Sequence, residues 1–394
     1  MKRRNLQIIA SAFLVLGCSE LPKEENLLTS EIQEIKTEFA PDKRVALFDI
    51  SAKQEGDVII LKGESNLPDA VNTFMKKLNA ENISFIDSIQ LLPSKELQGK
   101  TNGLVTISVA NLRSNPKHSA ELATQATLGT PIKIYKNEDD WSLIQTPDNY
   151  LSWVDSGGIV SLTNEQLNNW KIKDKIIFTK TYGHSYTEPN SGSQIVSDMV
   201  AGCILEFLTE QEAYYAVKYP DGRVGYISKS ESQPYTQWIA EMNPTGESLL
   251  ETSRTLMGVP YLWGGTSTKG MDCSGFTKTI YFLNGMVIPR DASQQVHTGK
   301  QTDENKDFEN LQKGDLLFFG RKATDSTKEK VVHVGMWIGN DEFIHASGQV
   351  RVSSINPKAE NFDAYNLNRY LRSKRILKEE DKDLIDLTRT PIFK

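Results

Sequence analysis

The spacing of hydrophobic residues along this chain predicts a series of small domains. In residues 27–39 the apolar positions recur at the spacing of one helical face, which predicts a helix. The segment that follows changes between period-two and helical spacing, as expected for a small α+β unit, for which we predict the boundaries 43–103. Its elements are two strands around a Glu-Gly-Asp turn, a helix and a further strand, in residues 44–65, 67–80 and 83–93.

An internal repeat without gaps follows this unit. Residues 128–154 align with residues 201–227, and each copy has short strands, an Asp-Asn or Asp-Gly turn and an aromatic strand. Both copies resemble bacterial SH3 domains, which are small β-barrels, so we predict barrels at 104–162 and 163–240. Any other duplicated β unit is the alternative. Cys203 falls in an apolar strand of the second copy, which predicts a packed core thiol.

The beginning of the chain has the pattern of an export signal. Basic residues precede an apolar run over residues 6–16, which is too short to span a bilayer. The run ends at Gly17-Cys18 and resembles a bacterial lipobox, so we predict a lipoprotein signal peptide over 1–18 and a lipid on Cys18. Residues 19–42 would then form a tether and a helix. An ordinary signal peptide, or a short core helix with a chance cysteine, is the alternative.

One cysteine has the sequence context of a nucleophile. Cys273 stands in the stretch Asp-Cys-Ser-Gly-Phe (272–276), after a Gly-rich turn and at the start of a run with helical spacing. A cysteine in the first turn of a helix feels the positive end of the dipole and the free backbone N–H groups, which we expect to lower its pKa. The same N–H groups can hold an oxyanion. A buried cysteine that acts only as a small hydrophobic residue is the alternative.

Two of the five histidines can serve this nucleophile. His333 and His345 lie in two predicted strands joined by a turn at Asn340-Asp341. Folding this hairpin brings the two imidazoles to one face of a sheet, as a base and its orienting partner require. We expect the other histidines, His118, His184 and His297, on the surface. A zinc site made of Cys, His and His is the rival chemistry, although no Cys-x-x-Cys pair or His-x-x-x-His helix is present.

These blocks together resemble a known family of enzymes. The order DCSGF, GDLLFF, HVGMWIGN, FIHASG is similar to that of the NlpC/p60 cysteine peptidases. The resemblance implies a papain-like domain over 241–378, followed by a tail over 379–394 that we expect to be a surface strap. It implies Cys273 as nucleophile, His333 as base and His345 as the residue that orients His333. Members cut the γ-D-glutamyl bond of peptidoglycan stem peptides and need no cofactor. The expected fold class is therefore multidomain α+β.

The two SH3-like domains make the resemblance more specific. With them, the chain is similar to γ-D-glutamyl-L-diamino acid endopeptidases, in which acidic groups and tyrosine hydroxyls hold the free ammonium of an N-terminal L-alanine. The positions that match this ammonium site are Asp291, Glu121 and Tyr150. The other positions for which we expect a place in substrate binding are Tyr261, Trp263, Asp272 and Ser274. Asp291 could instead be a helix cap. Ala292 departs from the serine common in the family, which puts a hydroxyl contact beside Asp291 in doubt.

Charge and composition limit the remaining choices. A net charge of −6 and an apolar share of 38% fit a globular protein without the clustered basic face of a nucleic-acid binder. Three cysteines do not make a disulfide framework. We expect a murein peptide as the substrate, a lipid anchor to the membrane at the periplasmic or cell surface, and a monomer. A non-catalytic wall-binding lipoprotein, or an amidase or acyltransferase on the same scaffold, is the alternative.

Overall fold

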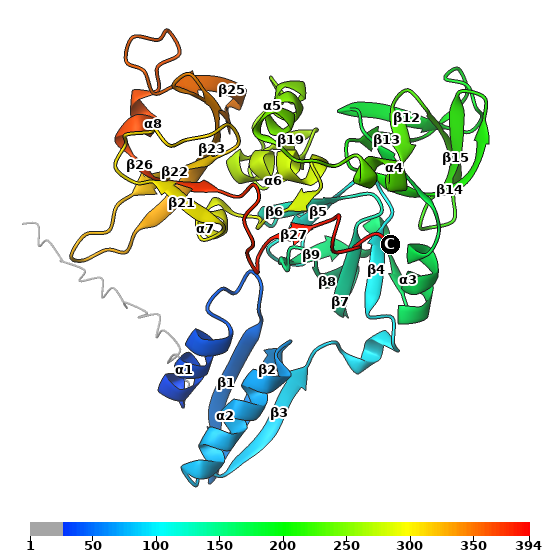
Figure 1. Ribbon diagram of the computed structural model, residues 1–394. Helices are drawn as coiled ribbons and strands as arrows, with labels where there is room; N and C mark the ends of the chain where they lie inside the picture. Colours follow the sequence, from blue (N-terminus) through cyan, green and yellow to red (C-terminus); the bar gives the residue numbers. More distant parts are fainter. Residues whose placement is uncertain (1–26) are drawn as a thin grey trace, which may run out of the picture.

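The computed structural model describes residues 27–394 and divides them into four parts (Figure 1). An N-terminal unit projects from a body made of two β-barrels and a C-terminal α+β domain. The expected multidomain α+β class is thus confirmed. The predicted signal peptide and its lipid-bearing Cys18 lie outside the described residues. Between residues 27 and 394, none of the helices combines the length and apolar character that crossing a bilayer requires.

The N-terminal unit is a three-stranded sheet covered by two helices. Strands β1 and β2 are antiparallel and β2 and β3 are parallel, in the order β1-β2-β3. The elements are α1 (Thr29–Phe39), β1 (Phe48–Glu55), β2 (Val58–Ser65), α2 (Pro68–Ala80) and β3 (Phe85–Leu91). Helix α2 begins with Pro68 at a position where a missing N–H does no harm, and it buries one face on the sheet.

The predicted start of this unit at residue 43 was wrong. Ile32 and Ile35 of α1 are buried in one cluster with Phe48 of β1 and Phe74 of α2. A helix of only 11 residues is marginal in water on its own, so its stability comes from this packing. Helix α1 is therefore part of the unit and not of a tether.

The internal repeat corresponds to two barrels with one topology. The first has the strand order β10-β4-β7-β8-β9-β5-β6, and the second, read from β17, has the corresponding order β17-β11-β14-β15-β16-β12-β13. Three consecutive strands begin at 131, 141 and 151 in the first barrel and at 204, 214 and 224 in the second. The aligned repeat therefore predicted equivalent strands correctly. Cys203 is fully buried in the second core, as expected.

The strands of the first barrel are β4 (Asn102–Val105), β5 (Val109–Arg113), β6 (Leu122–Thr127), β7 (Pro131–Glu138), β8 (Trp141–Gln145), β9 (Leu151–Asp155) and β10 (Ile159–Leu162). Those of the second are β11 (Lys175–Phe178), β12 (Tyr182–Tyr186), β13 (Ile195–Val200), β14 (Ile204–Gln211), β15 (Tyr214–Lys218), β16 (Val224–Ser228) and β17 (Ser232–Pro234). The short helices beside them are η1 (Lys95–Leu97), η2 (Ser156–Gly158), α3 (Asn164–Lys171) and α4 (Tyr235–Ala240).

The C-terminal domain packs helices on an antiparallel sheet in the order β21-β26-β22-β23-β24-β25. Its central helix, α6 (Cys273–Leu283), is buried against this sheet along nearly its whole length. The sheet strands are β21 (Lys300–Asp303), β22 (Leu316–Arg321), β23 (Lys330–Gly339), β24 (Glu342–Ser347), β25 (Gln349–Ser354) and β26 (Tyr370–Arg375). The other elements are α5 (Gly246–Thr255), β18 (Thr266–Ser267), β19 (Gly270–Met271), β20 (Met286–Val287), α7 (Ala292–Gln295) and α8 (Ala364–Asn368).

The C-terminal tail is not a surface strap. Its strand β27 (Ile385–Asp386) pairs with β20, and Phe393 is only 3% exposed. The Phe393 ring packs against Tyr235 of α4 and Phe282 of α6. The tail thus fills the junction between the second barrel and the C-terminal domain. The charged residues at the start of the tail misled the prediction, because the apolar residues that pack on the body begin only at Leu384.

Candidate active site

Cys273 is the first residue of α6, as the sequence predicted. Asp272 is the N-cap: its Oδ1 accepts the Gly275 N–H at 2.7 Å and its Oδ2 accepts the Gly264 N–H at 3.0 Å. A side chain at Gly275 would place its Cβ 2.0 Å from the Gly265 carbonyl oxygen, so this turn requires glycine. The Gly-rich stretch therefore fixes the start of the helix and the direction of the thiol.

The surroundings of Cys273 favour the protonated thiol over the thiolate. Burial raises its pKa to about 12, and the charge of Asp272 acts in the same direction. The backbone N–H groups of Val334 and Ser274 lower this pKa, but by less. The expected lowering by the helix N-terminus was therefore wrong, because desolvation of a thiolate outweighs the dipole here. The Val334 N–H also places the thiol beside β23, next to His333.

The two histidines form the predicted pair. His333 on β23 and His345 on β24 are two residues out of register, and His333 Nε2 lies 2.7 Å from His345 Nδ1. His345 Nε2 in turn lies 2.9 Å from Ser353 Oγ on β25. If His333 accepts a proton at Nδ1, its Nε2–H donates to His345, and the His345 Nε2–H donates to Ser353. This direction of hydrogen bonds leaves one basic nitrogen, Nδ1 of His333, free for the thiol.

Both imidazoles are neutral at rest. Burial lowers the pKa of His345 from its ordinary 6.5 to about 4, and burial followed by the neighbouring His345 lowers that of His333 well below 6.5. The thiol of Cys273 and the two imidazoles are thus all buried, and burial favours the uncharged form of each.

Ser353 was missed by the sequence analysis, although period-two spacing in the third strand places it on the face of His345. We expect Ser353→Ala to lower kcat about tenfold with little change in KM, because His345 loses the partner that fixes its tautomer. Steady-state kinetics across pH 5 to 9 measure this. Ser353→Thr, which keeps the hydroxyl, should recover much of the rate. An Ala variant with the unaltered rate and pH profile would contradict the role.

The same pair makes stability depend on pH. A histidine whose pKa is 6.5 when unfolded and about 4 when folded binds its proton more weakly in the folded state. Stability is therefore unaffected above about pH 6.5 and falls as the pH decreases towards 4. At pH 4.5 we expect a loss of roughly 2–3 kcal/mol from His345 alone.

Urea unfolding at pH 7.0 and 4.5, followed by the fluorescence of the six tryptophans, measures this loss. His345→Gln should show a smaller difference between the two pH values, since one titrating group is gone. An equal pH dependence in both chains would contradict the assignment.

A buried arginine joins the nucleophile's turn to the rest of the domain. Arg290 is 1% exposed and donates from Nη2 to Asp272 Oδ2 at 2.6 Å and from Nη1 to Asp272 Oδ1 at 3.1 Å. It also donates to Ser274 Oγ at 2.9 Å and, from Nε, to Thr124 Oγ1 in the first barrel at 3.0 Å. The side chains of Asp272 and Ser274 are thus engaged behind the nucleophile, and their expected contact with substrate stays a prediction. Nothing in the sequence marked Arg290 as buried.

The predicted ammonium residues make two separate contacts between the first barrel and the C-terminal domain. The Tyr150 hydroxyl, in the first barrel, donates to Asp291 Oδ2 at 3.1 Å, and Trp263 Nε1 donates to Glu121 Oε1 at 2.6 Å. Burial and the charge of Asp291 raise the pKa of Tyr150, so its hydroxyl keeps its proton. Asp291 is also the N-cap residue of α7, so the alternative that it caps a helix is confirmed. Its contact with an ammonium stays a prediction.

Tyr261 lies close to the nucleophile. Burial, with the charges of Cys273 and Asp272, raises the pKa of its hydroxyl, which therefore remains a donor. Trp263 is 62% exposed and contacts the first barrel through its hydrogen bond to Glu121. The zinc alternative finds no support, since no group of three or more suitable ligands is placed for a metal among residues 27–394.

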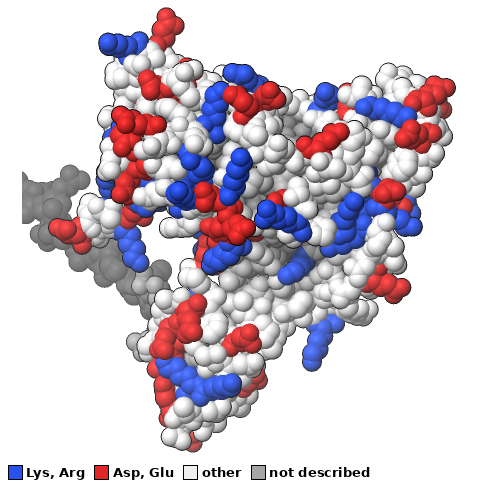
Figure 2. All heavy atoms as spheres, viewed as in Figure 1, with Lys and Arg blue, Asp and Glu red and all other residues white. Residues whose placement is uncertain are grey.

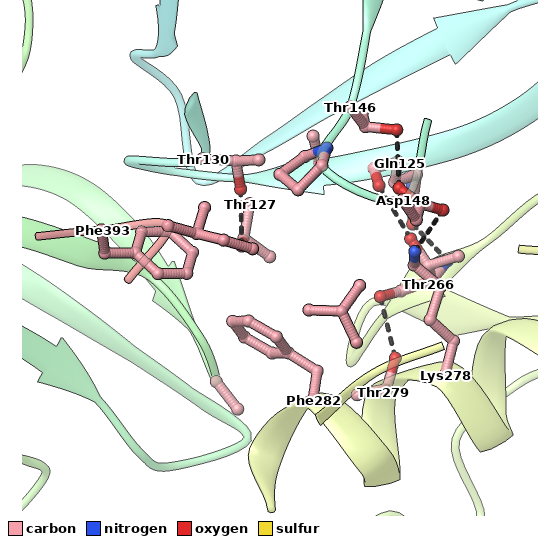
Figure 3. Close-up of a pocket in the computed structure, with 15 residues that line it drawn as sticks. Gln125, Thr127, Thr130, Thr146, Asp148, Thr266, Lys278, Thr279, Phe282 and Phe393 are labelled. Atoms are coloured by element: carbon pink, nitrogen blue, oxygen red, sulfur yellow. Dashed lines mark hydrogen bonds and ion pairs between the residues drawn. The ribbon is translucent and has the colours of Figure 1, made fainter. Parts of the chain in front are cut away.

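The first barrel is fixed to the C-terminal domain by polar contacts around a largely apolar pocket (Figure 3). Lys278 of α6 forms a buried ion pair with Asp148, which also accepts from Thr146 at 2.7 Å. Gln125 of β6 accepts from the Thr266 N–H at 3.0 Å. This docking holds Tyr150 against Asp291 and Glu121 against Trp263.

The fold and the site define a papain-like arrangement, with a helix-borne cysteine on a sheet that carries a histidine pair. Comparison with known proteins agrees. The profile of the NlpC/P60 family matches residues 258–368, and that of the bacterial SH3 domain matches residues 108–160.

Relatives and a solved structure extend this comparison. The chain is 32% identical over 245 residues to a γ-D-glutamyl-L-lysine dipeptidyl-peptidase of Bacillus cereus, covering 60% of this chain and 71% of that protein. It is 28% identical to dipeptidyl-peptidase 6 of Lysinibacillus sphaericus, covering 65% and 92%. A crystal structure of an NlpC/P60 family protein from Bacillus cereus superposes with a TM-score of 0.59 at 27% identity, covering 70% of this chain and 99% of that one. The chain belongs to the NlpC/P60 family.

Proposed function

We propose that this chain is a cysteine endopeptidase that hydrolyses the γ-D-glutamyl–L-diamino acid bond of murein peptides with a free N-terminal L-alanine. The observation that carries the proposal is the hydrogen-bonded series from His333 through His345 to Ser353, next to a helix-borne Cys273 whose thiol meets the backbone N–H of Val334. A non-catalytic wall-binding protein needs no such aligned series. The name of the Bacillus cereus relative supports the choice of bond.

The chemistry follows from the two neutral groups. As Cys273 Sγ attacks the γ-carbonyl carbon of D-glutamate, its proton passes to Nδ1 of His333. The backbone N–H of Cys273 and the Tyr261 hydroxyl donate to the oxyanion. His333 then gives the proton to the amine of the diamino acid, which leaves. Water attacks the thioester, losing a proton to His333, and the thiol leaves with that proton.

Mass spectrometry of purified protein with L-Ala-γ-D-Glu-L-Lys, L-Ala-γ-D-Glu-meso-diaminopimelate and their N-acetyl forms tests the proposal. Release of L-Ala-D-Glu from the free peptides, and little from the acetylated ones, is expected. Equal cleavage of both forms would keep the peptidase but remove the ammonium roles of Asp291, Glu121 and Tyr150. No cleavage would overturn the proposal in favour of a binding protein.

We also propose that the chain is exported and membrane-anchored through a lipid on Cys18, on the basis of the order of basic residues, apolar run and Gly17-Cys18. Partition of the expressed protein into the detergent phase of Triton X-114 tests this. A Cys18→Ala chain that partitions like the unaltered one would contradict lipidation.

A further inference from the structure

The N-terminal unit places a guanidinium in the predicted ammonium site. Arg44 lies in the link between α1 and β1, and its Nη1 donates to Asp291 Oδ2 at 2.7 Å and to Ser293 Oγ at 2.9 Å. The Tyr150 hydroxyl donates to the same Oδ2. The oxygen of Asp291 that faces Tyr150 is therefore already paired with a cation. Neither matching family profile extends to Arg44, since the first of them begins at residue 108.

Arg44 is held in this place by hydrogen bonds to its side chain and to its backbone. Asp42 accepts its Nε at 2.8 Å and its Nη2 at 2.7 Å, and Gln294 of α7 donates to Asp42 at 2.9 Å. The carbonyl of Arg44 accepts the N–H of Leu151, the residue after Tyr150, at 2.6 Å. The guanidinium, whose side chain is 32% exposed, is thus a fixed part of the site. Figure 2 shows basic and acidic side chains gathered above the N-terminal unit, where it meets the body.

The charges left for a substrate differ from those that the sequence suggested. Asp291 and Arg44 largely neutralise each other, and Asp42 shares the guanidinium. Asp291 Oδ1 lies 3.8 Å from Arg290 Nη1, which is again a cation. Glu121, the other acid predicted to meet the ammonium, is paired with the neutral donor Trp263 and not with a cation. An ammonium that approaches Asp291 is therefore repelled at short range by Arg44.

We infer that Arg44 is a specificity-determining residue, which weakens binding of the N-terminal ammonium and thereby limits the preference for free over N-acylated peptides. The inference rests on the proposed function. Arg44→Met should lower KM for L-Ala-γ-D-Glu-L-Lys about tenfold, since removing a like charge near the ammonium favours binding. The acetylated peptide carries no ammonium and should change little. kcat should stay within about twofold, because Arg44 contacts Asp291 and not the reacting atoms.

Lys43→Met is the matched control, because Lys43 is the exposed neighbour of Arg44 in the chain and its loss changes the net charge equally. Arg44→Lys keeps the charge and should give a KM closer to that of the unaltered chain than Arg44→Met does. Calorimetry with the same peptide on a Cys273→Ala background measures affinity without turnover. Thermal melting of each variant shows that it is folded.

The outcomes separate this inference from the proposed function. A lower KM and Kd for Arg44→Met alone support it. Equal values for Arg44→Met and Lys43→Met, or weaker binding in Arg44→Met, overturn it and make Arg44 a link between domains or a support for Asp291. An unaltered chain that treats free and acetylated peptides alike, in cleavage or in binding, refutes the ammonium site itself. Equal treatment of the two peptides is measured on the unaltered chain, without any variant. Failure of the ammonium site is therefore distinguishable from failure of the role given to Arg44.

Discussion

Cys273→Ala is expected to abolish release of L-Ala-D-Glu, with a fall in kcat on the order of 10⁴-fold or more. The reason is chemical: neither His333 nor Tyr261 can replace the sulfur as the atom that forms the thioester. The thiol is 7% exposed and packs with the helix core, so its loss removes little volume and the fold should persist. Mass spectrometry of the products and a thermal melt measure the two effects.

Cys203→Ala is the matched control for this variant. Cys203 is the other cysteine among the described residues, it is fully buried in the second barrel, and burial raises its pKa to about 12 as well. It has no histidine beside it, and its Sγ contacts the Ser108 carbonyl at 3.5 Å. Activity should therefore survive. A Cys273→Ala chain that still hydrolyses the peptide would refute covalent catalysis at this residue.

Arg290→Met is expected to lower the free energy of unfolding by about 3–5 kcal/mol. The substitution leaves the carboxylate of Asp272 buried without its cation, and also removes hydrogen bonds to Ser274 and Thr124. The turn that carries Cys273 should loosen, so activity should fall as well. Urea unfolding measures the loss of stability.

Two comparisons test this explanation. Adding Asp272→Asn to Arg290→Met removes the unpaired charge, so the double variant should be more stable than the sum of the single changes predicts. Arg372→Met breaks a half-exposed pair with Glu329 in the same domain and should have an effect of less than about 1 kcal/mol. Similar losses for Arg290→Met and Arg372→Met would contradict a buried ion pair as the cause.

The sequence alone determined the parts of this protein that depend on local pattern. The 73-residue offset of the repeat predicted the strands of both barrels, and equivalent strands do begin at residues 131 and 204. This was possible because the alternation of apolar and polar residues in a strand depends only on the residues of that strand. The Gly-rich turn and the apolar run placed Cys273 at the start of α6. A two-strand hairpin brought His333 and His345 together, since a short turn fixes the register.

The tertiary structure decided what depends on burial and on contacts between distant segments. The pKa of the Cys273 thiol is set by desolvation, which its neighbours in sequence do not reveal, and so the predicted lowering failed. The tail's Phe393 and the buried Arg290 gain their roles from segments far along the chain. Arg44 meets Asp291 across 247 residues. The periodicity of a segment predicts which face of a helix or strand is apolar, but it does not predict which other domain covers that face.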